Sequence, residues 1–176
     1  NANEAALKLA RKVTGRQNIF ALMGCFHGMT LGSLALTTDR TSRNGAGVSL
    51  DNVTFIPYES GFNTKVDSLD FLETILLDDH AGVDKPAAVI LETVQAEGGI
   101  YVASVEWLQR LEKICHDNDI LLIVDDIQVG NGRTGTFFSF ERAGIVPDMV
   151  VLIFIVPYGV IIDLYEKDKI FLQSVL

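Results

Sequence analysis

The chain has 176 residues, a formal net charge of −9 at pH 7 and a hydrophobic fraction of 48%. This length suits one domain or a large piece of one, and the hydrophobic fraction excludes a disordered chain. The acidic balance excludes binding to nucleic acid or to an anionic membrane through bulk charge, so we expect neither as a partner.

Cysteine use and the first residues of the chain favour a cytoplasmic protein. Cys25 and Cys115 make no disulfide framework, and Cys115 falls on the apolar side of a helical pattern. The segment from Asn1 to Glu4 has no leader pattern and no initiator methionine, so we expect no signal peptide and some residues upstream. The longest apolar run, 149–156, is too short to span a bilayer.

Helical and strand patterns alternate along the first half of the chain. Strong helix formers start it, and Gly15 supplies a stop for the first helix. The patterns predict, in chain order, helix 2–13, strand 18–23, loop 24–30, helix 31–37, exposed loop 39–51, strand 53–58 and helix 67–77.

The second half has a sharper pattern, with three strands that are apolar throughout. These strands are predicted over 87–91, 120–124 and 148–156, and an amphipathic helix over 104–118 separates the first two. Strands that are apolar on both faces and separated by helices are typical of a covered parallel sheet. We therefore predict an α/β fold with three layers, in which helices cover both faces of a mainly parallel sheet.

Carboxylates end two of these strands, at Glu92 and Asp125. A polar, glycine-bearing loop follows each of them, over 93–99 and 127–135. Because ligands of open α/β sheets sit at the carboxyl ends of the strands, the two loops predict a polar pocket there.

The segment 130–135 matches the G-x-G-x-x-G pattern and allows a dinucleotide site as an alternative. Residues 136–140 favour a strand over the helix that such a motif opens, and no acidic residue occurs in 150–154 to bind a ribose. The carboxylates of Asp125 and Asp126 would also face the pyrophosphate, so we disfavour a nicotinamide-dependent oxidoreductase.

The remaining polar residues give no second site. We expect His80 and His116 to be solvated and residues 78–80 to form a helix end. The cysteines and histidines lack the spacing of metal ligands, so we predict no metal.

Four segments together resemble the class III aminotransferases, which use pyridoxal phosphate (PLP). They are residues 3–11, 25–30, 92–99 and 121–135, and they occur in the order that the family has. The resemblance covers residues 1–152 and implies part of the large PLP-binding domain of fold type I, in a homodimer or larger oligomer. It also implies an amino acid and a keto acid as substrates. The particular residues of the motifs after Glu92 and Asp125 resemble those of family members that act on glutamate and aspartate 4-semialdehyde.

The resemblance assigns the cofactor-binding residues. Asp125 matches the aspartate that pairs with the ring nitrogen, where a held proton makes the cofactor a better electron sink. Phe26 matches the aromatic residue that stacks on the ring, and Gln128 the residue that binds the ring hydroxyl. The motif of Phe26 also contributes His27.

Four further residues take roles from the same resemblance. Asn1 and Ala2 match the turn that binds the phosphate, although the Gly-Thr pair expected before them is absent. Glu97 matches the glutamate that pairs with an arginine and swings as amino donor and keto acid alternate. Glu92 supports the Asp125 side of the pocket.

The tail, residues 153–176, departs from the family. The family continues after Leu152 with a lysine that forms the Schiff base and moves the proton, and no lysine stands there. Lys167 and Lys169 come too late, on a segment that we expect to be solvated. We therefore expect a fragment that is inactive alone, with a non-catalytic remnant or a transaminase of another omega-amino substrate as alternatives.

Overall fold

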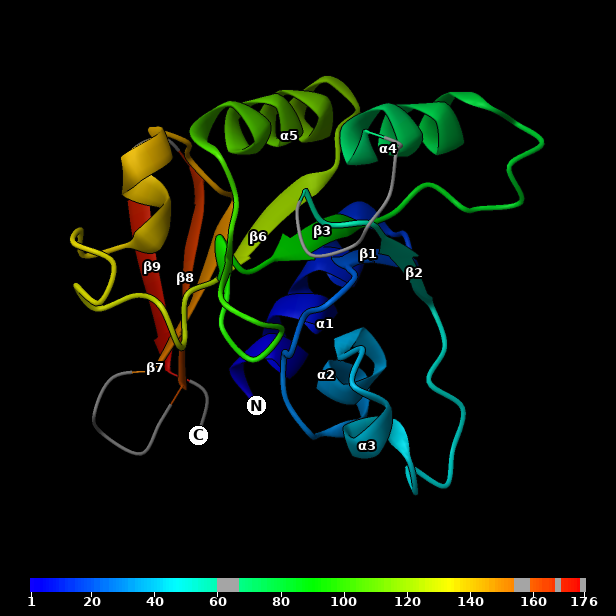
Figure 1. Cartoon of the computed structure of the whole chain (residues 1–176), viewed down its shortest axis with the longest axis horizontal. Helices are drawn as coiled ribbons and strands as arrows, with labels where there is room; N and C mark the ends of the chain where they lie inside the picture. Colours follow the sequence, from blue (N-terminus) through cyan, green and yellow to red (C-terminus); the bar gives the residue numbers. More distant parts are fainter. Residues whose placement is uncertain (60–66, 154–158, 167–168, 175–176) are drawn as a thin grey trace.

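A seven-stranded sheet forms the centre of the computed structural model (Figure 1). The structure describes residues 1–59, 67–153, 159–166 and 169–174. The strands lie in the order β2-β1-β3-β6-β7-β8-β9. Their bounds are β1 Ile19–Leu22, β2 Val53–Ile56, β3 Ala88–Leu91, β6 Leu121–Asp125, β7 Met149–Ile153, β8 Gly159–Glu166 and β9 Lys169–Ser174.

The first five strands of that order pair in parallel, and β8 and β9 continue the sheet in antiparallel fashion. The predicted α/β class with a mainly parallel sheet is therefore confirmed. β7 covers the first part of the strand predicted over 148–156, and residues 154–156 lie outside the described part of the chain. Lys167 also lies outside the described part.

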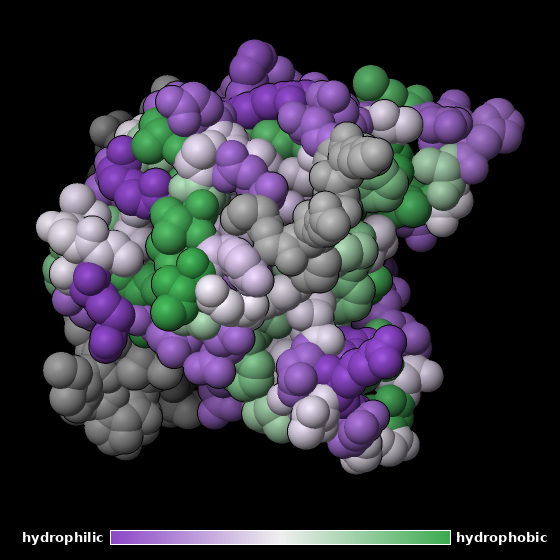
Figure 2. All heavy atoms as spheres, viewed as in Figure 1, coloured by the Kyte–Doolittle hydropathy of each residue, from purple (hydrophilic) through white to green (hydrophobic). Residues whose placement is uncertain are grey.

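Helices cover both faces of the sheet, as Figure 1 shows. One face carries α1 (Ala2–Thr14) and α2 (Leu31–Leu36), and the opposite face carries α4 (Ser68–Leu77) and α5 (Val105–Asp117). Hydrophilic residues cover the outer side of α5 (Figure 2), as expected for an amphipathic helix on a sheet.

Two apolar cores result, because successive residues of a strand point to opposite faces. Val89 and Leu91 of β3 join the core under α4 and α5, whereas Ala88 and Ile90 join the core under α1. Helix α1 presents alanines to the sheet, and Ala6 is fully buried. The cores sit on the two faces, which leaves the carboxyl ends of the strands open.

The residues at the ends of the predicted helices form the caps that their types indicate. Gly15 closes α1 with a φ of 71°, and its N–H donates to the carbonyl of Arg11. The side chain of Asp67 caps α4 by accepting from two backbone N–H groups, and Ser104 caps α5 by accepting from Trp107.

Three local expectations were wrong. The loop expected over 39–51 contains a one-turn helix, α3 (Arg40–Arg43), because Asp39 accepts from the N–H of Ser42 at 2.7 Å. The strand tendency of 136–140 gives way to a 3-10 helix, η1 (Ser139–Ala143). The loop over 93–99 opens with β4 (Val94–Gln95), which pairs with β5 (Tyr101–Val102).

Candidate active site

A cavity of about 680 Å³ opens at the carboxyl ends of the parallel strands. It lies between the start of α1 and the loops that follow β1, β3 and β6. All eight site residues predicted from the sequence line it: Asn1, Ala2, Phe26, His27, Glu92, Glu97, Asp125 and Gln128. The structure thus brings together residues from four separate segments of the chain.

The carboxylate of Asp125 is held by donors from three of these segments. His27 Nδ1 lies 2.7 Å from Asp125 Oδ2, and Asn3 Nδ2 donates to the same oxygen at 2.8 Å. The backbone N–H of Ile127 donates to Oδ1 at 3.2 Å. Asp125 is only 4% exposed, so these bonds replace the water that a carboxylate otherwise needs.

The imidazole of His27 is fully buried beside that carboxylate. Burial disfavours the charged imidazolium, but Cys25 and Asp125 favour it more strongly, and the pKa of His27 is raised well above its ordinary value. The His27 backbone is fixed as well, because its N–H donates to Thr37 Oγ1 at 3.0 Å. His27 is therefore a rigid partner of Asp125 in the wall of the cavity.

Glu92, which follows β3, is the second buried carboxyl group of the cavity. It is 4% exposed, and the backbone N–H of Phe26 donates to its Oε2 at 3.1 Å. Burial raises the pKa of Glu92 to about 7, against an opposing effect of His27. The Tyr58 hydroxyl donates to the Glu92 carbonyl at 3.1 Å and fixes the backbone there.

The loop after β3 packs tightly on the loop after β1. Gln95 Nε2 donates to the carbonyl of Met23 at 2.9 Å. A Cβ atom at Gly98 would overlap the carbonyl oxygen of Gly24, so only glycine allows this approach. The contact holds the segment of Glu97 against the segment of Phe26.

Glu97, Gln128 and Arg133 are exposed and form the rim of the cavity on the side of the loops after β3 and β6. Gln128 Nε2 donates to Glu97 Oε1 at 3.3 Å, which links the loops after β3 and β6. Arg133 adds an exposed positive charge to a cavity that also has the imidazole of His27 and three carboxyl groups, those of Glu92, Glu97 and Asp125.

The sequence did not point to Asn3 or Arg133 as site residues. Asn3 is 2% exposed in the first turn of α1, and only the fold brings it to Asp125. A polar amide on the apolar side of a helix was the available signal for Asn3. For Arg133 the signal was its place in the loop after Asp125.

The glycine-rich segment from Gly130 to Gly135 forms turns. Gly132 has a φ of 83° and Gly135 a φ of 101°, both in the region that favours glycine. The next regular element is η1, so the segment does not open a helix as a dinucleotide motif must.

Asp126 fixes the ends of that loop. It is fully buried and accepts from the N–H of Ser139 at 2.9 Å and from the Ser139 hydroxyl. The Ser139 hydroxyl also lies 2.5 Å from Thr93 Oγ1. The second carboxylate of the Asp125–Asp126 pair is therefore a structural clamp outside the cavity.

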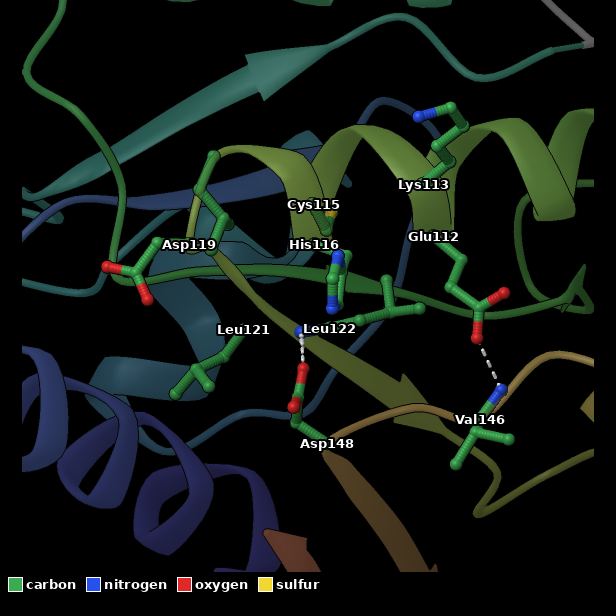
Figure 3. Close-up of a pocket in the computed structure, with 10 residues that line it drawn as sticks. Glu112, Lys113, Cys115, His116, Asp119, Leu121, Leu122, Val146 and Asp148 are labelled. Atoms are coloured by element: carbon green, nitrogen blue, oxygen red, sulfur yellow. Dashed lines mark hydrogen bonds between the residues drawn. The ribbon is translucent and has the colours of Figure 1, made fainter.

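A second cavity, of about 440 Å³, lies at the opposite, amino ends of β6 and β7 (Figure 3). Two of its three carboxylates already bind the backbone: Glu112 accepts from Val146 N–H at 2.6 Å and Asp148 from Leu122 N–H at 2.7 Å. Since ligands of open α/β sheets bind at the carboxyl ends, we place the candidate active site in the first cavity.

The remaining predicted polar residues lie at the surface. The side chains of His80 and His116 are 96% and 89% exposed, and α4 ends immediately before Asp78. Across the described ranges, no three His, Cys, Asp or Glu side chains gather where they could hold a metal ion. In the same ranges, no helix combines the length and apolar character needed to cross a membrane.

Known proteins resemble this chain over most of its length. Two diaminobutyrate–2-oxoglutarate transaminases, from Sporosarcina pasteurii and Vibrio parahaemolyticus, are 59% and 63% identical to the chain over 152 residues. Those residues are 86% of this chain but 35% and 36% of the relatives, so the chain spans about a third of their length.

A solved structure of a transaminase has a similar fold. The taurine:2-oxoglutarate aminotransferase from Bifidobacterium kashiwanohense, in complex with PLP and glutamate, matches with a TM-score of 0.74 and 29% identity. The match covers 86% of this chain and 36% of that one. Residues 1–154 match the family model described as aminotransferase class-III. The chain belongs to the class III aminotransferases.

Proposed function

We propose that this chain is the cofactor-binding part of a PLP-dependent transaminase for L-glutamate and aspartate 4-semialdehyde. The products are L-2,4-diaminobutyrate and 2-oxoglutarate, and the reaction is a step of ectoine synthesis in the cytoplasm. The substrate assignment is supported by the names of the relatives. The observation that carries the proposal is the carboxylate of Asp125, fixed by His27 and Asn3 in the wall of a cavity.

The residues of the cavity fit PLP, which supplies an electron sink for the amino acid when it is bound. Asp125 is a buried carboxylate that can hold a proton at a ring nitrogen. Phe26 is half-buried in the cavity wall and offers an apolar face to a ring. Gln128 has an amide that can bind a ring hydroxyl, and Asn1 and Ala2 line the cavity at the start of α1, where a helix N-terminus can bind a phosphate.

The two glutamates of the cavity, Glu97 and Glu92, have different roles in this proposal. Glu97 is exposed at the rim, where its carboxylate can pair with an arginine and release it for a keto acid. Glu92 is buried behind Phe26 and holds the backbone of the aromatic residue in place. Amino acid and keto acid enter from the rim in this proposal, while Asp125 and Phe26 lie deeper in the cavity.

The chain alone is inactive in this proposal. No lysine stands between Lys113 and Lys167, and no lysine occurs among the described residues that line the cavity. The family motifs end near residue 152, and the following segment to residue 176 is divergent. Activity belongs to a longer protein that forms a homodimer or larger oligomer.

A PLP titration of the purified chain tests the proposal. We expect saturable binding that the Asp125→Ala variant weakens at least tenfold, because a hydrogen bond to a charged group is lost. Borohydride reduction and peptide mapping should find no single labelled lysine. Asp119→Ala, at a carboxylate that is 94% exposed, is the matched control and should bind as the unmodified chain does.

Two results would contradict the proposal in different ways. Absence of saturable binding would mean that the cavity does not accept the cofactor. Reduction onto one lysine would mean that another lysine has taken the missing role, and a glutamate-dependent transamination assay of the chain would then follow.

A further inference from the structure

Asn3 makes two contacts that have no role in its own helix. Its Nδ2 donates to Asp125 Oδ2 at 2.8 Å and to the carbonyl of His27 at 2.7 Å. The side chain is buried, and its Oδ1 has no hydrogen-bond partner within the described part of the chain. The amide therefore acts only as a donor, and both of its acceptors belong to the candidate active site.

These contacts decide which oxygen of Asp125 stays available. A carboxylate oxygen has two lone pairs, and Oδ2 already faces both Asn3 Nδ2 and His27 Nδ1. Oδ1 receives only the N–H of Ile127, at 3.2 Å. A further donor can therefore be accepted by Oδ1, provided that the carboxylate does not rotate.

Helix propensity does not explain Asn3. Asn3 lies in the first turn of α1, where an asparagine side chain normally bonds nearby backbone. Here it bonds a strand end that is 122 positions away. Both acceptors of Asn3 Nδ2 lie outside α1, and its Oδ1 accepts from no N–H group in the described part of the chain, so its side chain does not cap the helix. Asn1, at the N-cap position, makes no side-chain capping bond either.

We propose that Asn3 is a positioning residue, which locks the Asp125 carboxylate so that Oδ2 is saturated and Oδ1 is offered to the ring nitrogen of the cofactor. The inference rests on the proposed function for the identity of that ligand. A short contact between His27 Nδ1 and Oδ2 agrees with it, because the buried imidazole keeps that oxygen occupied. Asn3 also ties the start of α1 to the loop of His27, so the lock links three elements.

The first experiment uses the full chain without cofactor and follows by NMR the proton on His27 Nδ1, the nitrogen that faces Asp125. In Asn3→Ala the carboxylate can rotate, so we expect this proton to exchange with water at least tenfold faster. Asn3→Asp keeps the shape but removes the donor, and it should act in the same direction. Leu7→Ala is the control, since Leu7 is buried in α1 and belongs to the apolar core under that helix.

The second experiment compares PLP with an analogue that has carbon in place of the ring nitrogen. Asn3→Ala should weaken PLP binding about tenfold and leave binding of the analogue unchanged. A merely structural role of Asn3 would weaken both ligands equally, as Leu7→Ala would if lost stability were the cause.

The outcomes separate this inference from the proposed function. If the unmodified chain binds no PLP, the proposed function fails, and the exchange rate of the His27 proton still decides whether Asn3 locks Asp125. If that rate is the same in Asn3→Ala and the unmodified chain, the positioning role is refuted. If PLP and the analogue respond equally to Asn3→Ala, the role toward the ring nitrogen is refuted.

Discussion

Glu92 shows how one residue of the cavity responds to burial. Its carboxyl group accepts a hydrogen bond from the backbone N–H of Phe26, and it shares the cavity wall with Asp125. Burial favours the neutral acid, which is why the pKa of Glu92 rises to about 7. The residue therefore changes charge near neutral pH, inside the wall of the candidate active site.

The free energy of unfolding of the unmodified chain should fall between pH 5 and pH 8 because Glu92 loses its proton. We expect the Glu92→Gln variant to lack this fall. The unfolded state ionises near the ordinary glutamate pKa of 4.5, whereas the folded state keeps the proton up to about 7. The unfolded state therefore binds fewer protons in this interval, and the free energy of unfolding falls with rising pH by roughly 3 kcal/mol. Urea unfolding at the two pH values measures the difference.

The exposed Glu106 of α5 provides the control for that measurement. Glu106→Gln should keep the pH dependence of the unmodified chain. An unchanged pH dependence in Glu92→Gln would mean that Glu92 is ionised throughout the interval and that its burial does not set its charge.

For single residues, the sequence predicted side chains that line the candidate site, but not the bonds between them. Glu92 and Asp125 were predictable because each follows an apolar strand, and parallel strands bring their carboxyl ends together. The contact of Asn3 with Asp125 was not predictable, because it joins two segments 122 positions apart. A family motif carries the identity of His27 but not the burial of its imidazole.

Among helices and strands, the long apolar patterns predicted the sheet and the major helices well. The short elements escaped because tertiary contacts decide them. Strands β4 and β5 have two residues each, which is too few for a periodic pattern. Helix η1 begins at Ser139, which Asp126 holds through two hydrogen bonds that no local pattern encodes.

The clamp between Asp126 and Ser139 leads to a second prediction. Ser139→Ala should lower the free energy of unfolding by about 1–3 kcal/mol, because it leaves a buried carboxylate with one fewer donor. The loop of Gln128 begins at this clamp, so PLP binding should weaken as well. Thr134→Ala is a matched control, since its hydroxyl makes a bond of 3.4 Å in the same loop.

Urea unfolding of both variants measures the two losses. Equal losses would contradict the clamp and would indicate that any hydroxyl in the loop contributes the same stability. A double-mutant cycle with Asp126→Asn isolates the contribution of the pair from other effects of each substitution.

Across the molecule, the two apolar cores share one sheet. Leu122 and Val124 of β6 point to the core under α4 and α5, and Ile123 between them points to the core under α1. Neither core can lose its strands without exposing the other. The described part of the chain should therefore unfold as one cooperative unit, with both faces and the active-site loops together.

Leu108→Ala tests this coupling from one face only. Leu108 is fully buried in α5, so its truncation should lower the free energy of unfolding by about 2–5 kcal/mol. If the sheet couples the cores, amide hydrogen exchange of α1 on the opposite face should accelerate by the same factor as that of α5. Leu77→Ala, at a residue of α4 that is 78% exposed, should change neither helix. Faster exchange confined to α5 would show that the two faces of the sheet unfold separately. The described part of the chain would then not be one cooperative unit.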